Sequence, residues 1–216
     1  MVRRLLAILV VSGFVVVAPA GPAAAQSDAR PTLAYAPGAA APHGLYFLQP
    51  EGAAAADGLR RVAPGEAADF AVLSAREALE RRARGDGLRV VYVLSRAAAD
   101  SVVLVASEHM LSSNPLKVEG VITLFERARR WLGTHEQELA ERLGAELRVP
   151  VATVQAALAG RDFQVARPGP ALAQALRAGA APAQAAAVDG LLDDRPARAA
   201  LRALDAPAAP LLVSQR

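Results

Sequence analysis

The chain lacks cysteine altogether and has few aromatic and lysine residues. Among its 216 residues there is no cysteine, aromatic side chains make up 4%, and Lys117 is the one lysine. The absence of cysteine excludes a disulfide framework and a thiolate metal site, so an ordinary apolar core has to hold the fold together. A chain of this length is long enough to bury such a core within one domain.

Residues with the spacing of a metal site or of a common catalytic motif are also missing. His43, His109 and His135 are the three histidines, and they lie far apart, without partners at ligand spacing. The sequence has no Gly-x-Ser-x-Gly elbow, no Walker loop and no dinucleotide-binding glycine motif. Asp193 and Asp194 are adjacent carboxylates, which could do acid–base work but more often mark a helix end or a solvated loop. We therefore expect no metal, no cofactor, no catalytic residue and no enzyme, and an exported enzyme of unrecognised type, which would need titratable groups that converge in one pocket, is the alternative.

The N-terminal residues have the three parts of a cleavable secretory signal. Arg3 and Arg4 give a positive start, residues 5–18 form an apolar run, and residues 23–25 supply the small side chains of a cleavage site. A membrane anchor is the alternative, but the apolar run is shorter than the roughly 18–20 residues that cross a bilayer. We expect residues 1–25 to be a signal peptide and the mature protein to lie outside the cytoplasm.

A large excess of positive charge is missing as well. The chain has 24 basic and 21 acidic residues, and removing Arg3 and Arg4 with the signal peptide leaves 22 basic residues against 21. Arginines alternate with acidic residues over residues 77–84, which is typical of a solvated helix face rather than of a phosphate-binding stripe. We therefore do not expect nucleic acid as a partner.

The first half of the mature chain has the pattern of alternating strands and helices. Residues 31–35 form a short apolar segment typical of a strand, and a short helix is predicted over residues 42–48. Residues 69–73 predict a second strand, Ser74 caps a helix over residues 75–84, and residues 88–94 predict a third strand. A strand, a helix and a strand in this order predict two parallel neighbouring strands with a right-handed crossover.

The second half is predicted to be helical after one more strand. Residues 101–106 form that strand, whose continuous apolar run suits a sheet covered on both faces, and residues 108–114 are predicted as a loop. Helices are predicted over residues 115–132, 150–158, 170–178 and 184–192. A further helix is predicted to begin with a capping box at residues 134–137. The sequence therefore predicts an α/β fold: one three-layer lobe over residues 26–204, with a mostly parallel sheet, a helical C-terminal region and a flexible tail over residues 205–216.

The loops at the carboxyl ends of the predicted parallel strands are the candidate binding region, because open α/β sheets collect small ligands there. Pro37 and His43 follow the first strand, and Ser74 follows the second. The hydroxyl of Ser74 and the backbone N–H groups after it lie at a predicted helix N-terminus, which attracts sulfonate, phosphate or carboxylate groups. The alternative is that Ser74 merely caps its helix.

Three segments resemble the periplasmic substrate-binding proteins of ABC importers, in the group that takes up nitrate, sulfonates, taurine and thiamine precursors. Residues 65–72 are similar to the Gly-Glu-Ala-Asp-Phe-Gly-Val run of that group, with one extra alanine. Residues 88–107 resemble the group's strands that cross toward a second lobe. Residues 118–163 resemble the helices that return to the first lobe.

The resemblance implies a two-lobed protein, but this sequence has room for one lobe. The second lobe would lie between Ser107 and Pro115, where the chain offers a short segment. The resemblance implies a periplasmic, non-enzymatic protein that binds a small anionic or heteroaromatic solute, with an ABC permease or a second copy of itself as partner. It places Pro37, His43, Ser74 and Ser101 near the ligand. The alternative is a degenerate lobe that acts as a periplasmic protein-interaction module.

Overall fold

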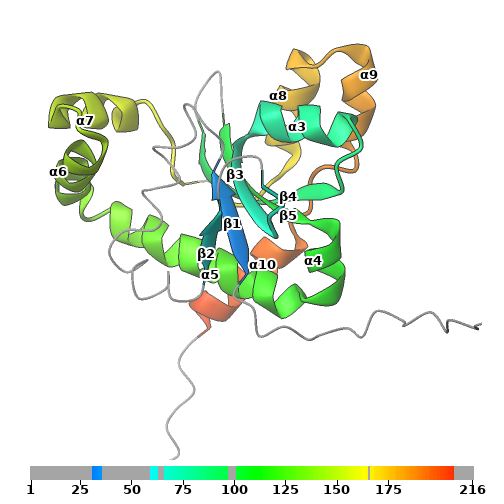
Figure 1. Ribbon diagram of the computed structural model, residues 1–216, viewed down its shortest axis with the longest axis horizontal. Helices are drawn as coiled ribbons and strands as arrows, with labels where there is room; N and C mark the ends of the chain where they lie inside the picture. Colours follow the sequence, from blue (N-terminus) through cyan, green and yellow to red (C-terminus); the bar gives the residue numbers. More distant parts are fainter. Residues whose placement is uncertain (1–30, 36–58, 63–65, 97–100, 165, 207–216) are drawn as a thin grey trace, which may run out of the picture.

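A computed structural model describes residues 31–35, 59–62, 66–96, 101–164 and 166–206 (Figure 1). The predicted signal peptide, the predicted helix over residues 42–48, and the candidate ligand residues Pro37 and His43 lie outside this part of the chain. No helix among the described residues is long and apolar enough to cross a membrane.

The described strands form one mixed sheet. Its spatial order is β2-β1-β3-β5-β4. Strand β1 pairs in parallel with β2 and β3, whereas β5 is antiparallel to both of its neighbours, so four of the five strands run in one direction. The strand bounds are Thr32–Tyr35 for β1, Arg60–Val62 for β2, Phe70–Ser74 for β3, Leu88–Arg96 for β4 and Ser101–Ser107 for β5.

The prediction that β3 and β4 are neighbours was wrong, because β5 lies between them. The strand–helix–strand pattern correctly gives β3 and β4 the same direction. However, β4 and β5 are joined by residues 97–100, and so short a connection favours an antiparallel pair. The second edge of β5 then pairs with β3, in the register Phe70 to Ala106 and Ser74 to Val102.

Side-chain and backbone hydrogen bonds join the starts of β1 and β3. The carboxylate of Asp69 accepts from the backbone N–H of Thr32 at 2.8 Å and from its hydroxyl at 2.9 Å. The Asp69 N–H donates in turn to the Thr32 hydroxyl oxygen at 2.9 Å. These reciprocal bonds fix the register of the two parallel strands at their amino ends.

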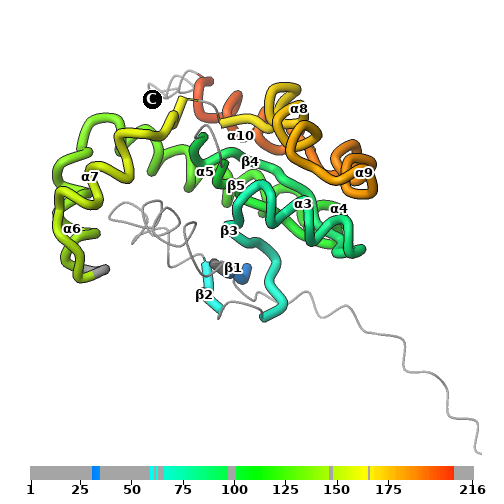
Figure 2. Tube along the Cα trace, turned by 90° about the horizontal axis from the view of Figure 1, so that it is seen from above, coloured from blue at the N-terminus to red at the C-terminus, as the bar shows by residue number. Residues whose placement is uncertain are grey.

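Helices cover both faces of the sheet, as the three-layer prediction requires (Figures 1 and 2). Alternate residues of β3 and β5 enter two separate cores: Val72 and Leu104 pack with α5 and α10, and Leu73 and Val103 pack with α3 and α8. The helix bounds are α3 Ala75–Ala83, α4 Glu108–Ser113, α5 Pro115–Leu132, α6 Glu136–Leu147, α7 Val151–Ala159, α8 Pro170–Gly179, α9 Pro182–Ala185, the 3-10 helix η1 Ala186–Val188 and α10 Arg195–Asp205.

Helices α6 and α7 pack against each other and project from one end of the sheet, while α8 and α9 lie at the opposite end (Figures 1 and 2). Gly144 of α6 lies where the chain turns back toward α7. A Cβ atom there would lie 3.0 Å from the carbonyl oxygen of Val149 and 3.3 Å from Cγ2 of Val151. The lack of a Cβ atom at Gly144 therefore permits the close approach of the turn and the start of α7.

The outer edge of β4 is covered by two irregular segments. The backbone of Arg96 exchanges two hydrogen bonds of 2.8 Å with Asp162, and the Val93 N–H donates to the Ala166 carbonyl at 2.9 Å. Further along, the Val90 N–H donates to Leu191 at 2.8 Å, and the Asp193 N–H donates to the Val90 carbonyl at 2.9 Å. These bonds satisfy backbone groups that an open edge would expose, and they place Asp162 and Ala166 beside the sheet.

Three local predictions for the helical region were wrong. Residues 108–113 form α4 rather than a loop, because the Ser107 hydroxyl accepts the Met110 N–H at 3.1 Å and caps a helical turn. Thr134 does not cap α6, because its hydroxyl donates to the Trp131 carbonyl at 3.0 Å instead. The helix predicted over residues 184–192 ends within η1, and the chain turns before α10.

Candidate functional site

Ser74 and Ser101 lie at the same edge of the sheet. Ser74 ends β3 and Ser101 begins β5, and the residue paired with Ser74 is Val102, the immediate neighbour of Ser101. Adjacent strands are about 4.8 Å apart. The fold thus brings together two of the four residues predicted to contact a ligand, and it does so at the carboxyl end of β3.

Ser74 is the N-cap of α3. Its hydroxyl oxygen accepts the Glu77 N–H at 3.0 Å, and its backbone is extended, with φ −67° and ψ 150°. The hydroxyl hydrogen has no acceptor among the described residues, so it can donate to a bound group. The half-buried Ser74 therefore caps its helix and still retains one donor at the positive end of the helix dipole.

Two arginines missed by the sequence analysis also belong to this edge. Arg96 ends β4, where its backbone pairs with Ser101 on one side and with Asp162 on the other. Arg161 donates from Nη1 to the hydroxyl of the buried Ser95 at 3.1 Å. A helix N-terminus, hydroxyl groups and guanidinium groups are the donors that suit an oxyanion.

A buried carboxylate holds the segment that carries Arg161. Glu126 of α5 is fully buried and accepts from the Tyr92 hydroxyl at 2.6 Å, from Arg129 Nε at 2.7 Å and from Arg130 Nε at 2.8 Å. Arg129 also donates from Nη1 to the carbonyl of Phe163 at 2.7 Å. One charge network thereby connects β4, α5 and the segment that follows α7.

The network sets the protonation states of its members. Burial acts to raise the pKa of Glu126, but the hydrogen bonds from Arg129, Arg130 and Tyr92 outweigh it and hold the pKa below the ordinary glutamate value. Burial, with the charge of Glu126, raises the pKa of Tyr92 well above its ordinary value. Glu126 is therefore an anion and Tyr92 a neutral donor at neutral pH.

The two described histidines do not form a metal site. His109 is in α4, and the His135 ring stacks on Trp131 with centroids 4.3 Å apart and planes 6° from parallel. Across the described residues, no group of three or more His, Cys, Asp and Glu side chains is placed to hold a metal ion. Asp193 and Asp194 lie at the start of α10, where Arg195 donates to Asp193 at 2.7 Å and thereby lowers its pKa.

No protein-family model matches the chain, and no curated protein is detectably similar to it in sequence. Several solved structures share its fold. The aliphatic sulphonate-binding protein SsuA of Escherichia coli superimposes with a TM-score of 0.54 at 10% identity, over 74% of this chain and 85% of that one. The alkanesulfonate-binding SsuA of Xanthomonas axonopodis pv. citri, bound to MOPS, gives 0.53 at 11% identity, over 69% and 90%. A protein of Bordetella bronchiseptica gives 0.59 at 12% identity, over 81% and 97%.

These likenesses show the fold. The chain has the fold of periplasmic binding proteins, which confirms the fold class that the resemblance implied. The two SsuA proteins are sulfonate-binding proteins.

Proposed function

We propose that this chain is an extracytoplasmic solute-binding-like protein related to the substrate-binding proteins of ABC importers, with one lobe that binds a small anionic or heteroaromatic solute. The observation that carries the proposal is the position of Ser74. In a fold shared with two sulfonate-binding proteins, it places a hydroxyl donor and a helix N-terminus at the carboxyl edge of the sheet.

The chemistry of this edge favours an oxyanion. The first backbone N–H groups of α3 and the Ser74 hydroxyl can donate to one oxygen atom each. Ser101 adds a second hydroxyl beside them, and Arg96 adds a positive charge to the same edge. A sulfonate, with three oxygen atoms and one negative charge, matches this set of donors better than a cation or an apolar ligand does.

A single lobe offers one wall of a binding site. Tight capture of a small polar ligand requires burial of most of its surface, so we expect weak binding by the isolated chain. A permease or a second copy of the chain would supply the opposite wall. The proposal therefore predicts millimolar affinity for the isolated protein.

The test is the thermal stability of the purified protein with sulfonates, nitrate, taurine, pyrimidines and amino acids. A ligand with a dissociation constant of about 1 mM adds about 1.4 kcal/mol of stability at about 10 mM. For a domain of this size that raises the Tm by roughly 3–5 °C. A rise of this size with one anionic or heteroaromatic class of ligand supports the proposal.

The matched variants are Ser74→Asp and Ser107→Asp. Each serine is a half-buried N-cap, and aspartate keeps the capping acceptor at both positions. Ser107 lies at the opposite end of β5, so Ser107→Asp should leave the anion response unchanged, whereas Ser74→Asp should abolish it through charge repulsion. A response that survives Ser74→Asp would refute a site at this edge. No response to any class, together with a dimer in light scattering, would favour the protein-interaction role instead.

A further inference from the structure

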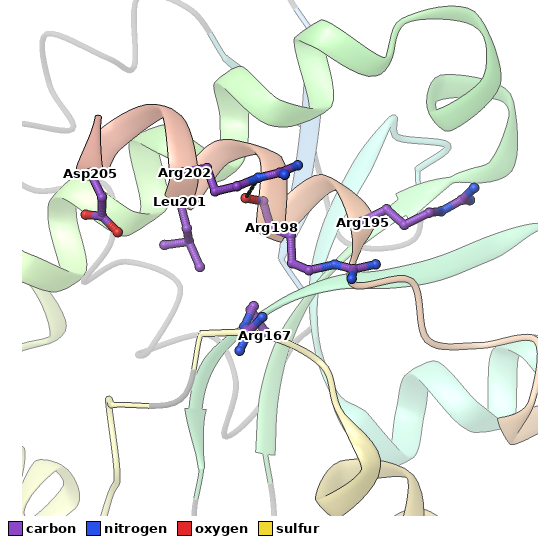
Figure 3. A pocket seen from close by; sticks show the side chains of 6 residues that line it. All are labelled: Arg167, Arg195, Arg198, Leu201, Arg202 and Asp205. Carbon is purple, nitrogen blue, oxygen red and sulfur yellow. Dashed lines mark hydrogen bonds between the residues drawn. The ribbon is translucent and has the colours of Figure 1, made fainter. Parts of the chain in front are cut away.

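The strongest charged feature apart from the Ser74 and Ser101 site is a chain of three adjacent hollows. The first, of about 620 Å³, lies between α10 and the segment before α8, and is lined by Arg167, Arg198, Leu201 and Arg202 among others (Figure 3). The second, of about 500 Å³, shares Arg167 and Leu201 with the first. The third, of about 570 Å³, continues along α5. The first and second hollows are called here the arginine groove, defined by Arg129, Arg130, Arg167, Arg195, Arg198 and Arg202.

Several of these arginines already have carboxylate partners. Arg129 and Arg130 bind the buried Glu126, and Arg130 also donates to Asp205 at 2.7 Å. Arg198 pairs with Asp194 at 3.1 Å, but their side chains are 51% and 37% exposed. Exposed pairs of this kind contribute little stability, so such a pair can be exchanged for contacts with a partner.

Arg167 and Arg202 differ from the others, because neither has a carboxylate partner among the described residues. Arg202 donates from Nε to the carbonyl of Arg198 at 3.2 Å, which leaves its two terminal nitrogen atoms available. Both side chains are exposed and line the same hollow, one from α10 and one from the opposite segment (Figure 3). A planar guanidinium group binds a carboxylate through two parallel hydrogen bonds, so these two residues can bind two carboxylates.

The shape of the groove favours an extended chain over a small molecule. Small-molecule sites enclose most of the ligand surface, whereas these hollows are open and run into one another along α5 and α10. Leu201 lines both hollows of the groove and offers one apolar contact between the arginines. An apolar contact among charged ones fits a peptide that carries acidic side chains.

The groove fits a peptide better than a nucleic acid. Asp194 and Asp205 line it beside the arginines. A peptide can place backbone N–H groups, rather than its own carboxylates, against these two aspartates, whereas a nucleic-acid backbone carries a negative phosphate at every residue. Nucleic-acid binding also relies on a surplus of positive charge, whereas this chain has 24 basic and 21 acidic residues.

We propose that the arginine groove docks an extended acidic segment of a partner protein, with Arg167 and Arg202 binding two of its carboxylates. This proposal does not depend on the solute site, because the groove lies along the outer side of β4 and α10 rather than at the Ser74 edge.

The test is the fluorescence anisotropy of labelled hexaglutamate with the full chain at low ionic strength, where charge attraction is least screened. We expect hexaglutamate to bind and labelled hexaglutamine not to bind. The double variant Arg167→Glu with Arg202→Glu should weaken the binding of hexaglutamate at least tenfold. A double variant with the same charge change elsewhere, Arg142→Glu with Arg177→Glu, should change it less than twofold, since those exposed arginines lie on α6 and α8.

Four outcomes would overturn the proposal: no binding of hexaglutamate, equal binding of hexaglutamine, equal losses in the two double variants, or tighter binding of a DNA oligonucleotide that depends on Arg167 and Arg202. Circular dichroism and the emission of Trp131 verify that each variant is folded. The sulfonate response at the Ser74 edge is measured on the same variants, so that failure of one proposal is distinguished from failure of the other.

Discussion

At the scale of single residues, the buried carboxylate of Glu126 should matter most for the stability of the fold. Its two carboxylate oxygens receive hydrogen bonds from a tyrosine and two arginines, and its side chain has no exposed surface. A buried charge with this many partners is costly to disturb in part, because each partner would be left with an unpaired group.

We expect Glu126→Gln to lower the free energy of unfolding by about 3 kcal/mol, because the guanidinium of Arg129 loses the charge that compensates it. Urea unfolding followed by the emission of Trp131, the one tryptophan of the chain, measures the loss. The control is Glu138→Gln. The carboxylate of Glu138 pairs with Arg142 on the exposed face of α6, so this substitution should lower the free energy of unfolding by less than about 0.5 kcal/mol. Equal effects of the two substitutions would contradict the importance of the buried network.

The same network predicts a dependence on acidic pH. Because the pKa of Glu126 is lower in the folded protein than its ordinary value of about 4.3, its contribution to stability is complete above that value and is lost as the pH falls through the folded pKa. The difference in unfolding free energy between the wild type and Glu126→Gln should be constant from about pH 5 to 7 and shrink below about pH 4. A difference that grows on acidification would refute this sign.

At the scale of elements, α6 ends at a strained residue. Arg148 has φ 55° and ψ 42°, in the left-handed region, and it is the one non-glycine residue with positive φ among those described. Side chains with a Cβ atom pay roughly 1–2 kcal/mol for this conformation, and helices commonly place glycine there.

Arg148→Gly should therefore raise the free energy of unfolding by up to about 1 kcal/mol, the gain being reduced by the greater freedom of glycine in the unfolded chain. Arg142→Gly, the same change in the middle of α6, should lower it by about 1 kcal/mol. Urea unfolding compares the two variants. Losses of the same size in both would mean that the left-handed turn carries no strain.

Local patterns predicted most elements but not how distant ones meet. The helix after Ser74 and the helix that Gly133 ends follow from side chains within a few residues, and both were predicted correctly. The insertion of β5 between β3 and β4 depends on competition between distant pairings. Helix α10 was not predicted, although the sequence has an aspartate at its N-cap and a proline in its first turn, as helix starts often do.

Of the candidate site, too, the sequence predicted the residues within clear local patterns but not those that distant segments bring in. Ser74 and Ser101 flank elements with clear sequence patterns, so their positions at the sheet edge could be anticipated. Arg161 reaches Ser95 across 66 residues because an irregular segment follows the edge of β4. Arg167 faces α10 for the same reason, and nothing periodic in the sequence indicates that path.

At the scale of the whole molecule, the sheet and the α6–α7 pair should differ in local stability. Strand β5 has neighbours on both sides, and residues 102–106 are all buried. Helices α6 and α7 pack chiefly on each other and project from the rest (Figure 2). Regions with fewer contacts open with lower free energies.

Hydrogen exchange followed by mass spectrometry should therefore find the slowest amides in peptides from β5 and markedly faster exchange in peptides from α6 and α7. Peptides from α5, which packs directly against β4 and α10, are the internal comparison among helices. Exchange in α6 and α7 as slow as in β5 would show that the two helices unfold only with the whole domain.

The central place of β5 also matters while the chain is being made. Strands β3 and β4 leave the ribosome before β5, yet neither can hydrogen-bond the other across the gap that β5 fills. Until residues 101–107 have emerged, β3 keeps an edge that can pair with a foreign strand. A chain that ends before residue 107 would therefore keep this edge open to misassembly.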